Sequence, residues 1–231
     1  MRVLRKWRDP REWFRNFESL ASRPFRGYYW PEELFMATFT LTDRVRELSR
    51  PLLAPVADFL ARLNVHPNTI SLLGFMGCVA AGVALALGHL RLAGFLLLFF
   101  GPLDAVDGLL ARRSGKQSLF GAFLDSTLDR YAEIAIFGGI LYFALESGLK
   151  SLAFLSFLAL AGSLMVSYAR ARAEALGLEC KVGLLTRFER LAVLTLGLFL
   201  GWVNAALVII ALLANLTAVQ RIIHVYRATQ K

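Results

Sequence analysis

The chain has 231 residues, of which 57% are hydrophobic, and it carries a formal net charge of +9. Soluble domains are about 45–50% apolar, so the composition excludes an ordinary soluble domain and indicates a multi-pass membrane protein. A positive excess of this kind suits loops that face the anionic lipids of the cytoplasmic leaflet. Nucleic acid is not an expected partner, because neither a groove pattern of aromatic and basic residues nor a zinc-ligand spacing accompanies the charge.

The part of the chain before the first apolar stretch divides into two segments. Residues 1–42 are a basic and aromatic extension to which the sequence assigns no chemistry. Residues 43–66 place apolar side chains at helical spacing, with arginines between them. We expect this second segment to form an amphipathic helix along the cytoplasmic membrane interface. A solvated helix packed against the membrane domain is the alternative.

Residues 67–227 are predicted to form the membrane domain. We expect transmembrane helices over residues 69–88, 92–111, 119–145, 151–172, 188–203 and 205–226. The links between them alternate between few and many basic residues, so the positive-inside rule places both termini in the cytoplasm. The expected fold is an all-α integral protein of the cell membrane, with six transmembrane helices preceded by one interfacial helix.

Four aspartates lie where the second and third expected spans meet the cytoplasm: Asp104, Asp107, Asp125 and Asp129. Within each pair, a spacing of three or four residues puts both carboxylates on one helix face. Carboxylates at membrane depth are costly and by default mark a functional site. Four such charges require cations, and an all-oxygen site suits two ions of Mg²⁺ or Mn²⁺. The alternative is that they only form buried salt bridges, with Arg112, Arg113 and Arg130.

The segment from Asp104 to Asp129 reads D-x2-D-G-x2-A-R-x8-G-x3-D-x3-D. At every fixed position it resembles the signature of the CDP-alcohol phosphotransferases, integral membrane enzymes of phospholipid synthesis. The resemblance covers roughly residues 43–227. It implies transfer of the phosphatidyl group of a CDP-lipid, such as CDP-diacylglycerol, to an alcohol, with release of CMP. The enzymes it resembles form homodimers, and the topology places the active site on the cytoplasmic side.

The resemblance also implies roles for individual residues. The four aspartates would bind the metal ions, and Asp129 would in addition act as the general base toward the acceptor hydroxyl. Arg112 would neutralise a phosphate, and Gly108 would let the cytidine lie against the helix backbone. The full set expected to contact the CDP-lipid is Asn68, Thr69, Ile70, Ser71, Asp107, Gly108, Arg112 and Ser118.

A second cluster of charges predicts where the acceptor binds. Four arginines fall where two later spans meet the cytoplasm: Arg170, Arg172, Arg187 and Arg190. Positive-inside anchoring explains any one of them. A pocket for a dianionic phosphate explains the whole set better, because clustered guanidinium groups bind phosphate oxygens strongly.

The segments around these arginines resemble the inositol-phosphate-using branch of the family, the phosphatidylinositol phosphate and archaetidylinositol phosphate synthases. The chain departs from that branch at Thr186, where an acid is usual. By this resemblance Arg170 and Arg190 would grip the phosphate of inositol 1-phosphate, with Arg227 assisting.

Two other functions stay open at this stage. Glycerol 3-phosphate is the nearest rival acceptor, as in a phosphatidylglycerophosphate synthase, because it too brings a phosphate. A cation or proton transporter is the alternative from a different class. Such a protein would scatter its buried acids over several helices and would have no need of Gly108, Ala111 and Arg112 between them.

Overall fold

The computed structural model describes residues 53–230, and the regular elements among them are α-helices. The extension at residues 1–42, and the part of the segment 43–66 that precedes residue 53, lie outside the described residues. Residues 53–62 are helical, in agreement with the helix expected there. The place of that helix at the membrane interface stays a prediction.

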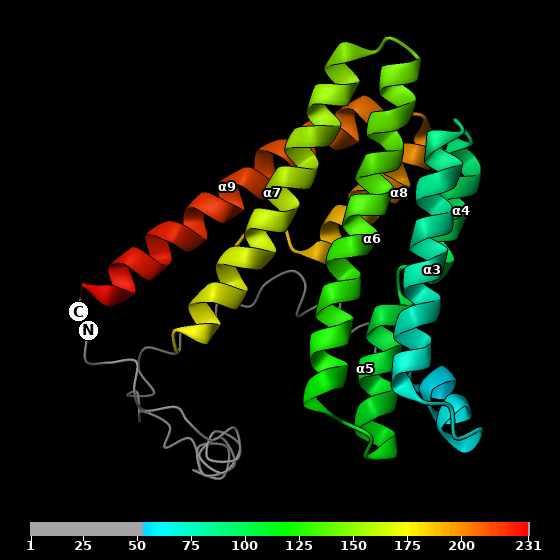
Figure 1. Cartoon of the computed structure of the whole chain (residues 1–231), viewed down its shortest axis with the longest axis vertical. Helices are drawn as coiled ribbons and strands as arrows, with labels where there is room; N and C mark the ends of the chain where they lie inside the picture. The colour runs from blue at the N-terminus through cyan, green and yellow to red at the C-terminus, as the bar shows by residue number, and fades with distance from the viewer. Residues whose placement is uncertain (1–52, 231) are drawn as a thin grey trace, which may run out of the picture. The chain divides into compact units, whose positions relative to one another are not determined.

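Within residues 67–229 the chain forms seven further helices (Figure 1). They are α3 (Pro67–Ala86), α4 (Leu90–Phe100), α5 (Leu103–Ser114), α6 (Leu119–Glu146), α7 (Lys150–Ala175), α8 (Arg187–Leu200) and α9 (Val203–Thr229). Each expected span therefore corresponds to a helical region, with ends that differ by a few residues.

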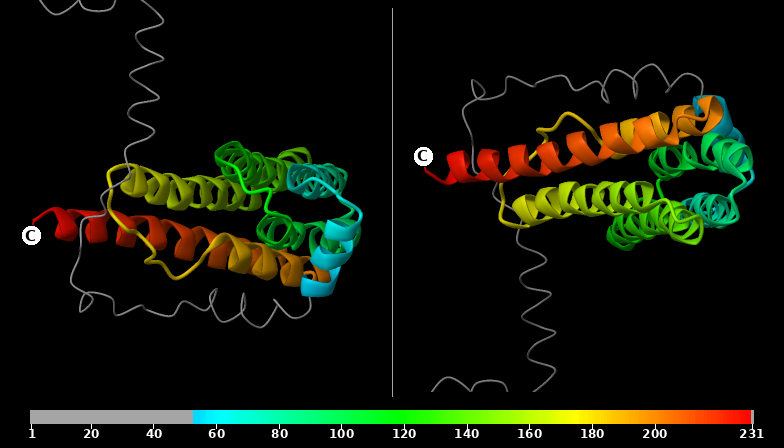
Figure 2. Two further views of the ribbon diagram at one scale, coloured as in Figure 1. Left: turned by 90° about the horizontal axis from the view of Figure 1, so that it is seen from below. Right: turned by 90° about the horizontal axis from the view of Figure 1, so that it is seen from above.

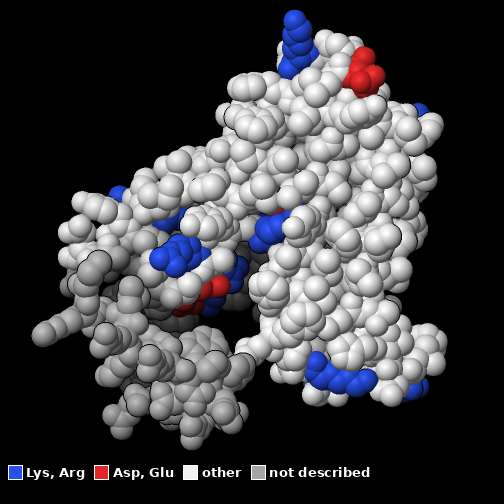
Figure 3. All heavy atoms as spheres, viewed as in Figure 1, with Lys and Arg blue, Asp and Glu red and all other residues white. Residues whose placement is uncertain are grey.

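Four stretches of the described residues are long and apolar enough to cross a membrane: Pro67–Ala86, Leu90–Ser114, Lys150–Ala175 and Val203–Thr229. On the face that Figure 3 shows, the upper third of the described part is uncharged apart from a few side chains at its tip and right edge, as suits contact with lipid. Helix α6 falls outside these four because four charged residues lie among its first 15, and α8 has only 14 residues. The helices support a multi-pass membrane protein, while the count of six spans stays a prediction.

The second expected span is interrupted. We expected one helix over residues 92–111, whereas α4 ends at Phe100 and α5 starts at Leu103. Pro102 lies between them, and a proline inside a helix removes a backbone donor and crowds the preceding turn. The break separates an apolar helix, α4, from a short polar one, α5, which carries the first two aspartates.

The helices pack in two main pairs. Helix α3 lies along α6, and α7 lies along α9, as both views of Figure 2 show for the second pair. At the crossing of α3 and α6, the backbones come so close that a Cβ added to Gly139 would overlap the carbonyl oxygen of Gly82. Small residues permit this approach between membrane helices. The pairing holds α6, with its two aspartates, against the start of α3.

The helix at residues 53–62 is joined to the polar end of α5. Arg113 forms an ion pair with Asp58 and donates a hydrogen bond to the carbonyl oxygen of Ala54 at 3.0 Å. Lys116 donates to the side chain of Asn64 at 2.5 Å. Arg113 is therefore engaged away from the aspartates of the signature, and the segment before α3 helps to hold α5 in place.

The close approach of α3 and α6 makes a testable prediction. Replacing Gly139 by alanine should lower the free energy of unfolding by about 1–3 kcal/mol, because overpacking forces the two backbones apart. The matched control is Gly138→Ala, since an added Cβ there meets nothing within 4 Å. Denaturant unfolding of both variants in detergent micelles measures the difference. Equal stability of the two variants would show that the helices do not meet at Gly139.

Candidate active site

The first pair of aspartates stands just after the helix break. Asp104 lies in the first turn of α5, where the free N–H groups of the helix favour a carboxylate. Asp107 lies one turn later and is buried, with 5% of its surface exposed. Its carboxylate accepts a hydrogen bond from the hydroxyl of Ser71, near the start of α3. The proline break thus begins a new helix whose opening turns carry both acids.

The second pair of aspartates lies on α6. Ser118 caps this helix, and its Oγ accepts a hydrogen bond from the N–H of Gly121 at 2.9 Å. Asp125 and Asp129 follow one turn apart, on one helix face. The cap fixes the residue at which α6 begins, and so fixes the position of both acids along the helix.

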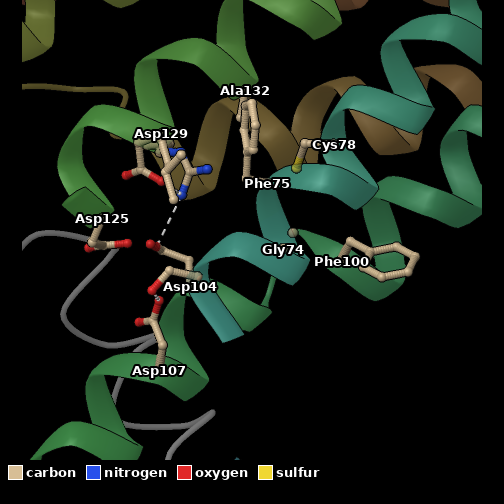
Figure 4. Close-up of a pocket in the computed structure, with 13 residues that line it drawn as sticks. Gly74, Phe75, Cys78, Phe100, Asp104, Asp107, Asp125, Asp129 and Ala132 are labelled. Carbon is tan, nitrogen blue, oxygen red and sulfur yellow. Dashed lines mark hydrogen bonds and ion pairs between the residues drawn. The ribbon is translucent and has the colours of Figure 1, made fainter. Parts of the chain in front are cut away.

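Three of the four acids meet. One carboxylate oxygen from each of Asp104, Asp107 and Asp125 lies within 4.8 Å of the others. Figure 4 shows these side chains turned toward one another between α5 and α6. Three carboxylates that close repel one another strongly unless a cation lies between them. Oxygen donors from several carboxylates are the ligands that hard divalent cations prefer, so the residues present fit a divalent metal ion.

The fourth acid, Asp129, is in contact with arginines. Arg187 enters from α8, and its Nη1 lies 2.7 Å from Asp129 Oδ1 and 3.1 Å from Asp104 Oδ2. Arg130 places Nη2 at 3.1 Å from Asp129 Oδ2. The salt bridges considered as an alternative therefore exist in part, and they leave Asp107 and Asp125 to the carboxylate cluster.

The four aspartates and Arg187 line one end of a small hollow. The other end is apolar and is lined by Gly74, Phe75, Cys78 and Phe100. Apolar walls with a few convergent charged groups are typical of a ligand site. A hollow with a charged end and an apolar end suits a ligand that has an anionic part and an apolar part.

Residues predicted to contact CDP gather at the start of α3. Asn68 and Thr69 lie in its first turn, where the N–H of Asn68 donates to the ring of His66 at 3.2 Å. Ser71 lines the hollow beside the acids. Ile70 has 5% of its surface exposed and packs in the core against α5, so its side chain supports the neighbouring turn.

The remaining predicted CDP contacts lie on α5 and at the start of α6. Arg112 is exposed and folds back along α5, where its Nε donates to the carbonyl oxygen of Gly108 at 3.0 Å. The starts of α3 and α6 come close, since a Cβ on Gly121 would lie 3.1 Å from Asn68 Oδ1 and 3.0 Å from Ser118 Oγ. The structure brings together the two chain segments that were predicted to share the nucleotide.

The arginines predicted for the acceptor do not form one cluster. Arg187 lines the hollow. Arg170 is exposed and pairs with Glu174 at 2.7 Å. Arg172 and Arg227 are also exposed.

Arg190 differs from the other four. It has 1% of its surface exposed, and its Nη2 lies 2.5 Å from Glu133 Oε1 on α6. Its Nη1 donates to the carbonyl oxygen of Leu185 at 3.1 Å. Sequence reasoning did not single out Glu133, although a signal was present. It stands four residues after Asp129, which continues the face of Asp125 and Asp129 into an otherwise apolar helix.

Membrane-capable helices and a carboxylate cluster that fits a divalent cation, at the charged end of a partly apolar hollow, define a multi-pass membrane enzyme. Residues 64–221 match the CDP-alcohol phosphatidyltransferase family. The chain belongs to that family.

Relatives and solved structures agree with this assignment. The chain is 36% identical over 194 residues to an archaetidylinositol phosphate synthase from Methanothermobacter thermautotrophicus, covering 81% of this chain and 95% of the relative. It is similar to the phosphatidylinositol phosphate synthase of Mycobacterium tuberculosis with CDP-DAG bound, with a TM-score of 0.70, 30% identity, and coverage of 76% and 94%. The same enzyme in complex with manganese and citrate matches with a TM-score of 0.68, 29% identity, and coverage of 75% and 88%.

The carboxylate cluster predicts the metal affinity of the protein. Asp104→Asn should weaken Mn²⁺ binding by about tenfold or more, because it removes one charged oxygen donor from the cluster. Glu146→Gln, at the far end of α6, is the control that changes net charge equally. Electron paramagnetic resonance titration of free Mn²⁺ measures the affinity of both variants without reference to turnover. Equal affinities would place the metal elsewhere.

Proposed function

We propose that the protein transfers the phosphatidyl group of a CDP-lipid, such as CDP-diacylglycerol, to a hydroxyl of inositol 1-phosphate and releases CMP. One observation supports a phosphorylated acceptor, which membership of the family alone does not specify. Arg187 lies between Asp104 and Asp129, which places a guanidinium beside the aspartate proposed as the base. A phosphorylated acceptor has a dianionic group for that cation to bind, whereas ethanolamine and choline have no anionic group and serine has only a singly charged carboxylate beside its ammonium.

The donor would occupy the segments that meet around the start of α3. We assign its diphosphate to the carboxylate cluster through Mg²⁺, with two ions bound by Asp104, Asp107, Asp125 and Asp129 and with Mn²⁺ as a substitute. Bound cations of this kind stabilise the negative charge that develops on transferring and leaving phosphate oxygens. Asn68, Thr69, Ile70, Ser71, Asp107, Gly108, Arg112 and Ser118 remain the proposed contacts of the CDP moiety.

The reaction needs a base next to the acceptor hydroxyl. The hydroxyl oxygen attacks the phosphorus atom of the phosphatidyl group, and the bond from that phosphorus to the oxygen of the CMP phosphate breaks. The hydroxyl proton passes to Asp129, whose side chain is 14% exposed and lines the hollow. Arg187 would hold the acceptor phosphate while the hydroxyl lies near Asp129.

The other arginines take different parts in this proposal. Arg170, Arg172 and Arg227 are exposed and free of the protein core, so they can meet an anionic acceptor as it enters from the cytoplasm. Direct contact between Arg190 and the acceptor would require its buried pair with Glu133 to open. We therefore assign the direct phosphate contact to Arg187.

The remaining features follow from the sequence and the family. We infer six transmembrane spans in the cell membrane, with both termini and the active site in the cytoplasm, and a homodimer. The basic residues Arg112 and Lys116 at the end of α5, and Arg227 at the end of α9, suit the cytoplasmic side under the positive-inside rule.

An acceptor panel tests the proposed function. Protein in detergent with Mg²⁺ and CDP-diacylglycerol should release CMP fastest with inositol 1-phosphate, more slowly with glycerol 3-phosphate and at background rate with serine. The reason is that only phosphorylated acceptors bring a dianionic group to Arg187. Inositol 1-phosphate is expected to be the faster of the two because the similar proteins are named as inositol phosphate lipid synthases. Faster release with glycerol 3-phosphate would reassign the acceptor. No CMP release with any acceptor would remove the enzyme function and favour a transporter that uses the buried acids.

The general base makes a separate prediction. Asp129→Asn keeps the size of the side chain and removes its ability to accept a proton, so turnover should fall by about a hundredfold or more. Binding of CDP-diacylglycerol, measured by isothermal titration, should change little, since the three acids of the carboxylate cluster are unaltered. Turnover within a few-fold of the unaltered protein would remove Asp129 from the base role.

A further inference from the structure

The segment between α7 and α8, residues 176–186, leads directly to Arg187 and has no regular secondary structure. Irregular backbone at or near membrane depth is stable only where its polar groups find partners inside the protein. In this segment, side chains of α9 supply many of those partners. How they do so determines where α8 begins.

Three side chains of α9 bind the segment, and they share one helix face because they lie four and three residues apart. Thr217 Oγ1 accepts hydrogen bonds from the N–H groups of Leu184 at 3.2 Å and Leu185 at 3.3 Å. Arg221 donates from Nε to the carbonyl oxygen of Val182 at 2.9 Å. Figure 1 shows the segment passing close to α9 before it enters α8.

The remaining contacts extend this attachment along α9 on the C-terminal side of Thr217. Arg221 also donates to the carbonyl oxygen of Val166 on α7 at 2.5 Å. The ring of His224 lies 3.1 Å from the carbonyl oxygen of Glu179. The segment is therefore attached to α9 at its beginning, middle and end.

Thr217 is the contact nearest to the active site. It is fully buried, with 0% of its surface exposed, and its methyl group packs against Gly183, where an added Cβ would overlap it. The two N–H groups that it binds belong to the second and third residues before Arg187. Since a buried N–H without a partner is costly, this single hydroxyl holds the backbone on the approach to α8.

The backbone that follows is fixed equally well. The N–H of Thr186 donates to the carboxylate of Glu189 at 2.5 Å, which forms part of a capping box at the start of α8. Arg187 is the next residue, and its Nη1 reaches Asp129 at 2.7 Å. A shift of Leu184 and Leu185 would therefore reach the start of α8 and change the point from which the Arg187 side chain extends toward Asp129.

We propose that Thr217 is a positioning residue for the acceptor site. It acts through the backbone of Leu184 and Leu185 to set the position of Arg187, and it touches neither substrate. This inference rests on the proposed function, because it takes Arg187 to bind the acceptor phosphate. The inference predicts an effect on binding of the acceptor and not on binding of the CDP-lipid. The proposed CDP contacts lie on α3, α5 and α6, away from the segment that Thr217 holds.

The test uses the full chain in detergent micelles with CDP-diacylglycerol, inositol 1-phosphate and Mg²⁺. Thr217→Val keeps the shape of the side chain and removes the acceptor oxygen. It should raise KM for inositol 1-phosphate by about tenfold or more, as expected when a buried donor and a partly buried donor lose their partner. The KM for CDP-diacylglycerol should change by less than about twofold, because its proposed contacts lie away from the segment that Thr217 holds. Thr217→Ser restores the oxygen and should return the acceptor KM to near its original value.

A matched control removes another buried hydroxyl. Ser163 on α7 has 0% of its surface exposed, and within the described residues its Oγ has no hydrogen-bond partner. Ser163→Ala should leave both KM values unchanged. If Thr217→Val does not yield folded protein, Thr217→Cys replaces it, because sulfur is a weak acceptor and should raise the acceptor KM less but in the same direction.

Several outcomes overturn the inference. An unchanged acceptor KM in Thr217→Val, or an equal rise of KM for both substrates, means that Thr217 has only a structural role. A lowered melting temperature with both KM values unchanged leads to the same conclusion, as does failure of serine to restore the acceptor KM. If the unaltered protein releases no CMP with inositol 1-phosphate, the proposed function itself fails, and that result is visible before any variant is compared.

Discussion

The contact of Arg187 with Asp104 and Asp129 is the interaction on which the site depends. The two acids come from different helices, α5 and α6, and the guanidinium comes from a third, α8. Carboxylates in a poorly solvated hollow are unfavourable unless positive charge compensates them. Arg187 compensates two acids at one end of the hollow, while Asp107 and Asp125 remain with Asp104 as an oxygen cluster suited to a divalent cation. Under the proposed function, the site combines a metal-binding side and a phosphate-binding side within one group of charges.

A second ion pair lies behind this contact and fixes the relation of α6 to α8. Glu133 is four residues after Asp129, and Arg190 is three after Arg187, so the two helices face each other with two consecutive pairs of charges. Glu133 and Arg190 each have 1% of their surface exposed. Burying a lone charge costs several kcal/mol, roughly 3–5 when one partner of a buried pair is lost. Such a pair strongly favours the one helix register in which both members meet, and that register also brings Arg187 to Asp129.

A proline, helix caps and a buried hydroxyl around the site set where the helices that carry its charged residues begin. Pro102 ends α4 and allows a new helix to begin just before Asp104. Ser118 caps α6 and sets the start of the helix that carries Asp125. On the other side, Thr217 and the capping box at Glu189 fix the start of α8. The starts of α6 and α8 are fixed by small polar contacts and the start of α5 follows a proline, so features at helix starts help to determine the geometry of the charges.

The sequence predicted much of this, and the parts it missed have a common cause. Local spacing was sufficient to place Asp104 with Asp107 and Asp125 with Asp129, because helical periodicity decides which neighbours share a face. Hydropathy located the helical regions for the same reason. It did not show that Pro102 interrupts the second span, since proline is tolerated in many membrane helices. The sequence also could not predict which of the arginines would be buried and which would line the hollow. Arg187 and Arg190 are three residues apart, yet only tertiary packing against Glu133 decides that one is buried and the other lines the hollow.

The most direct test of phosphatidyl transfer to inositol phosphate is to follow the acceptor into the lipid. Protein reconstituted in vesicles with CDP-diacylglycerol and Mg²⁺ is incubated with ¹³C-labelled inositol 1-phosphate, and the extracted lipids and the released CMP are measured by mass spectrometry. The predicted result is one new lipid that contains the labelled inositol, the phosphodiester and the original phosphomonoester, formed in equal amount to CMP. Release of CMP with phosphatidic acid and no label in the lipid would contradict transfer to inositol phosphate and would indicate hydrolysis instead.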